Sequence, residues 1–555
     1  MTSAQTGRLR DGGPDWWRGA VFYQIYPRSF ADTNGDGIGD LPGVIAHLDY
    51  VAALGVDAIW LSPFFTSPMR DFGYDISDYH GVDPLFGTLD DFKRLVAAAH
   101  ARGLRVIIDS VLSHTSDQHP WFAESRASRD NDKADWYVWA DPTKDGTPPN
   151  NWQSVFGGPA WHWDATRGQY YLHNFLHSQP DLNFHNADVR AGLLDVLRFW
   201  LELGVDGFRL DVVNFYFHDR ALRSNPPAAA GALLSTVAAA NPYGGQDHLY
   251  DKTQPENLAF LEELRRLLDD YPGAAAMGEL VADGDIAPVM AQYTQKDARL
   301  HTAYSFDLLA PNFSARHIRD VIERMERGIG DGWPSWAFSN HDVARVISRW
   351  GFAAHAGKAA PLLIALLCSL RGSICLYQGE ELGLSEADIP FDQLQDPYGI
   401  QFWPDYKGRD GCRTPMPWTT EPVTAGFTTG SPWLPIPPEH NSRAVAVQEP
   451  DPASAVHRVR RFLRWRRGMR QLHLGTIRCL DLPEPLLGIM REDADTTVVA
   501  VFNLGLQPCT VTLDDLGGMT PCGAPDFTGE LREGTLHLGA LDAYFGTAKP
   551  RIRPR

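Results

Sequence analysis

The stretch Gly207-Phe208-Arg209-Leu210-Asp211 ends an apolar, strand-like run and carries an arginine and an aspartate two positions apart. Side chains two positions apart on a β-strand lie on the same face, so we expect Arg209 and Asp211 to lie side by side. A neighbouring guanidinium favours the ionised carboxylate and fixes its direction, which a carboxylate nucleophile requires. A buried ion pair without a catalytic role would use the same two residues, and the pair taken alone favours that simpler interpretation.

The rest of the chain changes this balance, because Asp109, Glu279 and Asp342 end or follow three other apolar runs. Helical patterns such as Leu89–Arg102 alternate with these runs. Eight strand–helix repeats, with strands apolar on both faces, predict an α/β fold, a (β/α)8 TIM barrel. The eight predicted strands are Val21–Tyr26, Asp57–Ser62, Leu104–Asp109, Val205–Asp211, Ala274–Glu279, Thr302–Phe306, Ser335–Ser339 and Ser373–Tyr377.

Two connections are longer than the others and predict additions to the barrel. Residues 1–110 and 181–475 are expected to form the barrel, with 111–180 as a small inserted domain over its mouth after strand 3. Residues 380–452 form a long insertion after strand 8. Alternating apolar residues in 476–555 predict a C-terminal antiparallel, β-sandwich-like domain.

Composition excludes several function classes. The 555 residues carry a formal net charge of −19, which argues against a nucleic-acid partner. The six cysteines show no CxxC spacing, so we expect neither a disulfide framework nor a zinc site. The N-terminal residues lack a signal-peptide pattern, and the longest apolar run, 359–370, is too short to cross a bilayer. These features predict a cytoplasmic protein without a membrane partner.

The chemistry is predicted from where the acids meet. In a TIM barrel the reactive groups gather at the carboxyl ends of the strands, so Asp109, Asp211, Glu279 and Asp342 should converge on one mouth. Converging acids repel one another unless their protonation states differ. One ionised and one protonated carboxyl group suit glycoside hydrolysis through an oxocarbenium-like transition state.

Several motifs carry a family resemblance from about Trp17 to the C-terminus. The chain resembles the α-amylase family of retaining glycoside hydrolases, and within it the α-glucosidase and oligo-1,6-glucosidase branch. The motifs are Asp109-Ser-Val-Leu-Ser-His114, Gly207-Phe-Arg-Leu-Asp211, Gly278-Glu279, Phe338-Ser-Asn-His-Asp342 and, typical of the oligo-1,6-glucosidase branch, Gln179-Pro-Asp-Leu-Asn183.

The resemblance implies a role for each matching residue. Asp211 would be the nucleophile that forms a covalent glucosyl-enzyme, and Glu279 the general acid and then the base. Asp342 would bind the sugar 2- and 3-hydroxyls. Retention implies a separation of about 5–5.5 Å between the two catalytic carboxyl groups. Orientation of the nucleophile and the sugar would fall to Arg209, His114 and His341.

Two further segments indicate an exo-acting pocket for a small α-glucoside. Tyr74 resembles the family tyrosine that stacks on the terminal glucose, and an aromatic face suits an apolar sugar face. Asp71 would bind the 4-hydroxyl of the non-reducing end and pair with Arg409, which would wall off longer chains. Arg413 is a rival for this pairing, and a purely structural pair is the alternative.

The loop from Asp32 to Asp40 predicts a structural cation site. Its oxygen ligands would be Asp32, Asn34, Asp36, the Ile38 carbonyl group and Asp40, as in the first part of an EF-hand loop. Gly43 stands where an EF-hand has its bidentate glutamate. We therefore expect Ca²⁺ or Mg²⁺ remote from the chemistry, and no organic cofactor; a capped turn before a helix is the alternative.

Two residues depart from or refine the family pattern. Ser113 stands where the family has Asn before its histidine, and its shorter side chain puts that contact in doubt. Val212 follows the nucleophile, as in α-1,6-active relatives. The leading hypothesis is an exo-α-glucosidase with some transglucosylation. A sucrose-directed glucosyltransferase, isomerase or hydrolase is the second, and a non-catalytic barrel like transporter accessory subunits is the third; the oligomeric state stays open.

Overall fold

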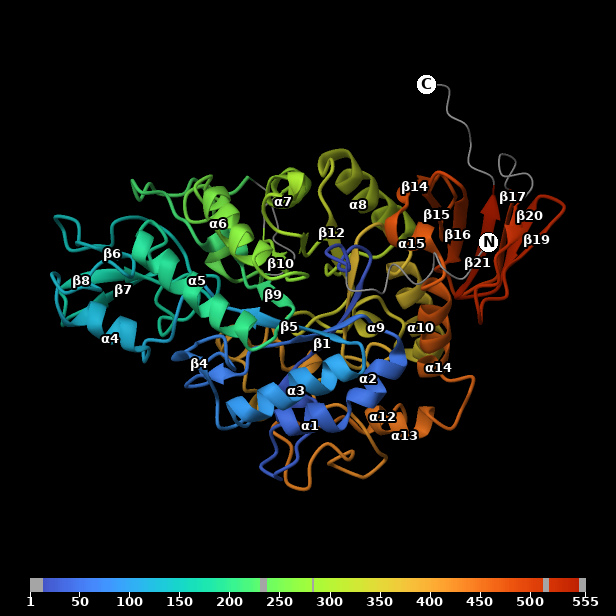
Figure 1. Cartoon of the computed structure of the whole chain (residues 1–555), viewed down its shortest axis with the longest axis horizontal. Coiled ribbons are helices and arrows are strands. Elements are labelled where there is room, and N and C mark those ends of the chain that lie inside the picture. Colours follow the sequence, from blue (N-terminus) through green and yellow to red (C-terminus); the bar gives the residue numbers. More distant parts are fainter. Residues whose placement is uncertain (1–12, 230–236, 282–283, 513–518, 549–555) are drawn as a thin grey trace.

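A computed structural model describes residues 13–229, 237–281, 284–512 and 519–548. Eight parallel strands close into a barrel, which confirms the predicted (β/α)8 fold (Figure 1). Around the barrel the order is β1 (Val21–Ile25), β13 (Ser373–Tyr377), β12 (Pro334–Ala337), β11 (Thr302–Tyr304), β10 (Ala275–Glu279), β9 (Gly207–Leu210), β5 (Arg105–Ser110) and β2 (Ala58–Leu61).

The strands are buried on both faces, as expected for a parallel sheet covered by helices. On β2, Ala58 and Trp60 belong to the cluster inside the barrel, whereas Ile59 and Leu61 join the larger core outside it. This alternation explains why the strands read as continuous apolar runs in the sequence.

Helices cover the outside of the barrel. The helix α3 begins at a capping box, in which Thr88 and Asp91 each accept a backbone N–H group of the other. The helix α14 packs against α10 and α2, and α15 follows it. The helices are α1 (Leu41–Ala46), α2 (Leu48–Leu54), α3 (Leu89–Ala101), α5 (Ala187–Glu202), α6 (Asn257–Asp269), α7 (Ala287–Thr294), α8 (Ala315–Gly328), α9 (Val346–Arg349), α10 (Ala356–Leu367), α14 (Ala455–Arg466) and α15 (Arg470–Leu474). No helix in the described part of the chain has the length and apolar character needed to cross a bilayer.

Long connections build up the mouth of the barrel. The segment after β5 holds α4 (Pro120–Ala127) and a three-stranded antiparallel sheet, at one end of the molecule in Figure 1. That sheet consists of β6 (Trp139–Ala140), β7 (Trp161–Asp164) and β8 (Gln169–Leu172). The hairpin of β3 (Phe65–Thr66) and β4 (Asp78–Val82) follows β2. After β13 come three short helices, α11 (Pro397–Phe402), α12 (Pro438–Asn441) and α13 (Val445–Gln448).

A third long connection was not predicted. It runs from the end of β9 at Leu210 to the start of α6 at Asn257. Its mixture of polar, Pro and Ala residues has no strong period, so the sequence pattern gave no sign that it would join the mouth of the barrel.

The C-terminal part forms two antiparallel sheets, as predicted, at the end of the molecule opposite α4 (Figure 1). Leu486, Val501 and Tyr544 of the larger sheet pack with Leu536 and Leu538 of the smaller one. The larger sheet has the order β14 (Thr476–Leu480), β15 (Leu486–Glu492), β16 (Thr497–Asn503), β21 (Asp542–Ala548) and β18 (Thr520–Pro521); the smaller has β17 (Cys509–Thr512), β20 (Thr535–Leu538) and β19 (Glu530–Arg532).

Candidate active site

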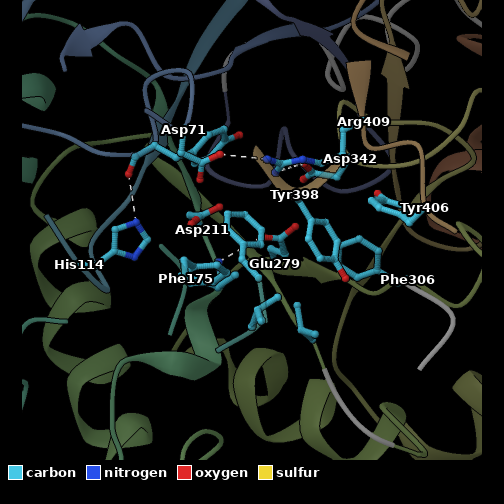
Figure 2. Close-up of a pocket in the computed structure, with 15 residues that line it drawn as sticks. Asp71, His114, Phe175, Asp211, Glu279, Phe306, Asp342, Tyr398, Tyr406 and Arg409 are labelled. Atoms are coloured by element: carbon cyan, nitrogen blue, oxygen red, sulfur yellow. Dashed lines mark hydrogen bonds and ion pairs between the residues drawn. The ribbon is translucent and has the colours of Figure 1, made fainter. Parts of the chain in front are cut away.

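A pocket of about 120 Å³ lies at the carboxyl ends of the barrel strands (Figure 2). This is the face on which TIM-barrel enzymes carry their active sites. Seven of the predicted site residues line it together: Asp71, Tyr74, His114, Asp211, Glu279, Asp342 and Arg409. The pocket is completed by Val155, Phe156, Phe175, Val212, Val281, Phe306, Tyr398 and Tyr406.

Arg209 lies fully buried beneath the pocket and contacts three carboxyl groups. Its Nη1 atom is 2.8 Å from Asp109 Oδ1 and 2.5 Å from Asp211 Oδ1, and its Nη2 atom is 2.7 Å from Glu279 Oε2. The expected contact between Arg209 and Asp211 is therefore present, but it is one of three. A single cation compensates one of three negative charges.

The backbone turn after β9 links the two predicted catalytic acids. Asp211 follows the last strand residue, and Val212 adopts a left-handed conformation with φ 36° and ψ 50°. This conformation is strained for a β-branched residue. It allows the Val212 N–H group to donate to Glu279 Oε2 at 3.1 Å. Asp211 and Glu279 are thus held in one small region, through Arg209 on one side and the Val212 amide on the other.

The buried cluster retains protons near neutral pH. Burial raises the pKa of Asp211 to about 7 and that of Glu279 to about 7, against the opposing effect of Arg209. Burial likewise raises the pKa of Asp109 to about 6. We expected Arg209 to keep Asp211 ionised at all times. In the structure the guanidinium is divided among three acids, so it only partly offsets the effect of burial on the pKa of Asp211.

Asp342 has the opposite setting. Burial alone would raise its pKa, but His341 and the guanidinium groups of Arg409 and Arg413 hold the pKa well below its ordinary value. Its Oδ1 atom lies 3.2 Å from Arg409 Nη1 and 3.0 Å from Arg413 Nη2. Asp342 is therefore ionised throughout the neutral range and can accept hydrogen bonds from two hydroxyl groups of a ligand.

The far wall of the pocket is a network around Arg409. Its Nη2 atom is 3.0 Å from Asp71 Oδ1, whereas Arg413 donates to the His341 carbonyl group and to Asp342. Arg409 is thus the partner of Asp71. Asp396, also fully buried, accepts from Arg409 Nε and Nη2 at 3.1 and 2.8 Å.

Tyr74 and the two histidines contact one another beside the pocket. The Tyr74 ring is stacked on the His341 ring, and its hydroxyl group is 2.5 Å from His341 Nε2 and 3.2 Å from Asp109 Oδ2. His114 Nε2 lies 3.0 Å from the Tyr74 carbonyl oxygen. Burial lowers the pKa of His114 to about 4 and that of His341 to about 3, so both rings are neutral at pH 7. Ser113 contacts the adjacent His114, with its Oγ atom 2.9 Å from His114 Nδ1.

Besides the unpredicted residues of the pocket lining, three polar residues that contact the predicted ones were not themselves predicted as site residues. Gln179 Nε2 donates to Asp71 and lies 3.1 Å from His114 Nε2, and its place in a recognised motif was a usable signal. Asp396 sits in the long connection after β13, where no pattern distinguishes it. Tyr304 ends β11 and contacts Arg209 and Glu279. The available signal for Tyr304 was its position: it ends an apolar strand that lies beside the strand of Glu279.

The predicted cation loop lies apart from the pocket lining. Asp32 accepts the N–H groups of Gly35 and Gly37, and Asp40 accepts that of Gly43 at the start of α1. The donor set, carboxylate and carbonyl oxygens, suits a hard divalent cation. Asp40, however, is used as the helix cap, and the described residues contain no group of three or more His, Cys, Asp or Glu that could hold an ion. The loop therefore stays a predicted cation site.

Comparisons with known proteins agree with this geometry. Residues 24–475 match the family model for the alpha amylase catalytic domain. The chain is 55% identical, over 97% of its length and 98% of the relative, to the probable alpha-glucosidase of Rhizobium meliloti (strain 1021). It is 39% identical to the oligo-1,6-glucosidase of Heyndrickxia coagulans, over 79% of this chain and 83% of that protein.

A solved structure extends the agreement to the whole fold. The crystal structure of the alpha-glucosyl transfer enzyme XgtA aligns with a TM-score of 0.94 and 57% identity, and covers 96% of this chain and 99% of XgtA. The resemblance read from the motifs is thereby confirmed, and the chain belongs to the alpha-amylase family.

Proposed function

We propose that the protein is a retaining, exo-acting α-glucosidase that removes terminal α-linked glucose from short oligosaccharides and disaccharides. The observation that carries this proposal is the shared setting of Asp211 and Glu279, which line one pocket and are both bonded to Arg209. The names of the glucosidase relatives support an α-glucoside as the small-molecule substrate.

In the first step, a carboxylate oxygen of Asp211 attacks the anomeric carbon while Glu279 gives its proton to the glycosidic oxygen. The bond from the anomeric carbon to that oxygen breaks, and the aglycone leaves as an alcohol. Arg209 holds Oδ1 of Asp211, which leaves Oδ2 as the attacking oxygen. The productive form of the pair has Asp211 ionised and Glu279 protonated.

In the second step, Glu279 takes a proton from water, and the water oxygen attacks the anomeric carbon of the glucosyl-enzyme. The bond to Asp211 breaks, and α-glucose is released with its configuration retained. An acceptor hydroxyl group in place of water gives a transferred glucoside. The likeness to an alpha-glucosyl transfer enzyme supports some transglucosylation.

The remaining residues bind the glucosyl ring. Ionised Asp342 accepts hydrogen bonds from the 2- and 3-hydroxyls, and these strengthen as the ring flattens. Asp71, fixed by Arg409, binds the 4-hydroxyl group and closes the pocket behind the terminal glucose. Tyr74 presents its ring to the sugar face, with its hydroxyl group held by His341 and Asp109. The non-catalytic alternative finds no support here, because Asp211, Glu279 and Asp342 all line the pocket.

The test is a product profile on maltose, isomaltose, trehalose and sucrose, with the first glucose anomer followed by ¹H NMR. α-Glucose as the first product supports the proposal. β-Glucose, or no glucose release from any of the four, overturns it. Fructose released together with an isomeric disaccharide from sucrose alone would favour the sucrose-directed enzyme. Cytoplasmic location stays a prediction.

A further inference from the structure

Tyr304 occupies a position that the proposed mechanism does not use. It is the last residue of β11 and stands opposite Glu279, the last residue of β10, in the parallel register of the two strands. Its side chain is buried, with 1% of its surface exposed, and its ring packs near Trp60. The register of the barrel therefore places a phenol group beside Glu279 Oε1, whereas the Val212 N–H group contacts Oε2.

The hydrogen bonds of the Tyr304 hydroxyl group have only one consistent direction. Arg209 Nε and Nη2 lie 3.1 and 2.7 Å from the phenol oxygen, and a guanidinium can only donate. The oxygen therefore accepts from Arg209, and its single proton is left for Glu279 Oε1, which is 3.0 Å away. Burial raises the pKa of Tyr304 well above its ordinary value, so the phenol remains a donor over the whole working range.

Glu279 is thus contacted by donors at both of its oxygens. Oε1 accepts from Tyr304, and Oε2 accepts from the Val212 N–H group and forms an ion pair with Arg209. Donors to a carboxyl group stabilise its ionised form and oppose the effect of burial on the pKa. They also fix the plane of the carboxyl group, so that a proton on Glu279 must occupy a position that these contacts leave open.

We propose that Tyr304 is a positioning residue for the reaction, whose hydroxyl group orients Glu279 and sets how readily Glu279 gives up and regains its proton. This inference rests on the proposed function, because it assigns Tyr304 to the acid and base step of that mechanism. The charged groups that act on the pair are Asp109 of β5, Arg209 of β9, Asp211 after β9 and Asp342 after β12.

The test compares Tyr304→Phe with the wild-type enzyme and with Tyr293→Phe. The control removes another buried phenol hydroxyl, which is bonded to Asn257 and lies outside the pocket lining. Loss of the Tyr304 donor should raise the pKa of Glu279. The basic limb of the pH profile of kcat/KM is therefore expected to move to higher pH by about one pH unit. It should also lower kcat/KM for maltose about ten-fold. The loss for α-glucosyl fluoride, whose leaving group needs little protonation, should be smaller; Tyr293→Phe should show neither effect.

An unmoved basic limb, or equal losses for maltose and α-glucosyl fluoride, would overturn the inference. If Tyr304→Phe does not fold, 3-fluorotyrosine at position 304 keeps the ring and the hydroxyl group. Its more acidic phenol is a stronger donor and should move the basic limb to lower pH, and an upward or absent shift counts against the inference. A ¹³C NMR titration of the Glu279 carboxyl group reads the same pKa without activity. A wild-type enzyme that cleaves no α-glucoside would refute the proposed function separately.

Discussion

Arg409 Nη2 lies 3.0 Å from Asp71 Oδ1, although 338 positions separate the two residues in the sequence. The same guanidinium bonds Asp396 through two nitrogen atoms and reaches Asp342 at 3.2 Å. One side chain therefore joins the β3–β4 connection, the end of β12 and the long connection after β13. Bidentate arginine–carboxylate pairs carry directional as well as electrostatic stabilisation, so this wall is well defined in shape.

Asp71→Asn is expected to lower kcat/KM for terminal glucosides about 100-fold, because a charged acceptor for the 4-hydroxyl group is replaced by a neutral one. The matched substrate is a 4-deoxyglucoside. For the wild-type enzyme, kcat/KM should be much lower on the 4-deoxyglucoside than on the glucoside, whereas for the variant the two values should be similar. Equal costs in both enzymes would show that Asp71 does not bind that hydroxyl group.

Asp211→Asn is expected to reduce turnover by roughly four orders of magnitude, because an amide cannot form the glucosyl ester. The fold should survive. Asp211 is one of three acids around a single cation, so neutralising it relieves repulsion, and the melting temperature should not fall. Steady-state kinetics and thermal unfolding together test this, and a variant with a near-normal rate would remove the nucleophile assignment.

The pH profile of kcat/KM is expected to be bell-shaped and centred near pH 7, since the pKa values of Asp211 and Glu279 are both raised to about 7. Below this range both acids are protonated and the nucleophile is lost; above it both are ionised and the acid is lost. Glu279→Gln removes a like charge, so the pKa of Asp211 should fall and the acidic limb should move to lower pH. The burst of 4-nitrophenol from its α-glucoside measures this limb, and an upward shift would contradict the coupling.

Val212→Thr is expected to raise activity on maltose relative to isomaltose. Val212 lines the pocket, and threonine offers the aglycone a hydroxyl group that valine lacks. Both side chains are β-branched, so the strained left-handed conformation at position 212 costs both about the same. The ratio of the two kcat/KM values is the measurement, with Val212→Ala as the control for lost volume. An unchanged ratio would show that Val212 does not set the linkage preference.

The cation site of loop 32–40 stays a prediction, and chelation tests it. If Ca²⁺ or Mg²⁺ binds there, EDTA should lower the melting temperature and added cation should restore it, while kcat at 25 °C stays unchanged. Asp36→Asn should weaken the response to cation. A melting temperature that is indifferent to EDTA and to both cations would leave the loop as a capped turn.

The barrel was predictable because its strands are buried on both faces and end at recognisable acids. Asp109, Glu279 and Asp342 mark strand ends by residue type alone, and the closed barrel brings them together. The predicted strands differ from the observed ones by no more than two residues at either end. The sequence predicted Arg409 as the partner of Asp71 but left Arg413 as a rival, since both lie in one irregular segment and only the fold separates them.

The protonation of the site also lay beyond the sequence. Two residues, Arg209 and Asp211, suggest a simple ion pair, but the share of charge that Arg209 gives to Asp211 depends on how many acids surround it. Tyr304 joins this group only because its strand lies beside β10 in a fixed register. Contacts between side chains on neighbouring strands arise only when the barrel forms, so a local sequence pattern cannot predict them.

The wall formed by Asp71 and Arg409 also bears on the order in which the two products leave the pocket. In the proposed mechanism the aglycone leaves first, while the glucosyl ring stays bound to Asp211. Glucose is therefore the last product to leave in each cycle, and a new substrate must wait until it has gone. Free glucose would thus compete with substrate for the empty enzyme, whereas the departed alcohol would compete with water for the glucosyl ester.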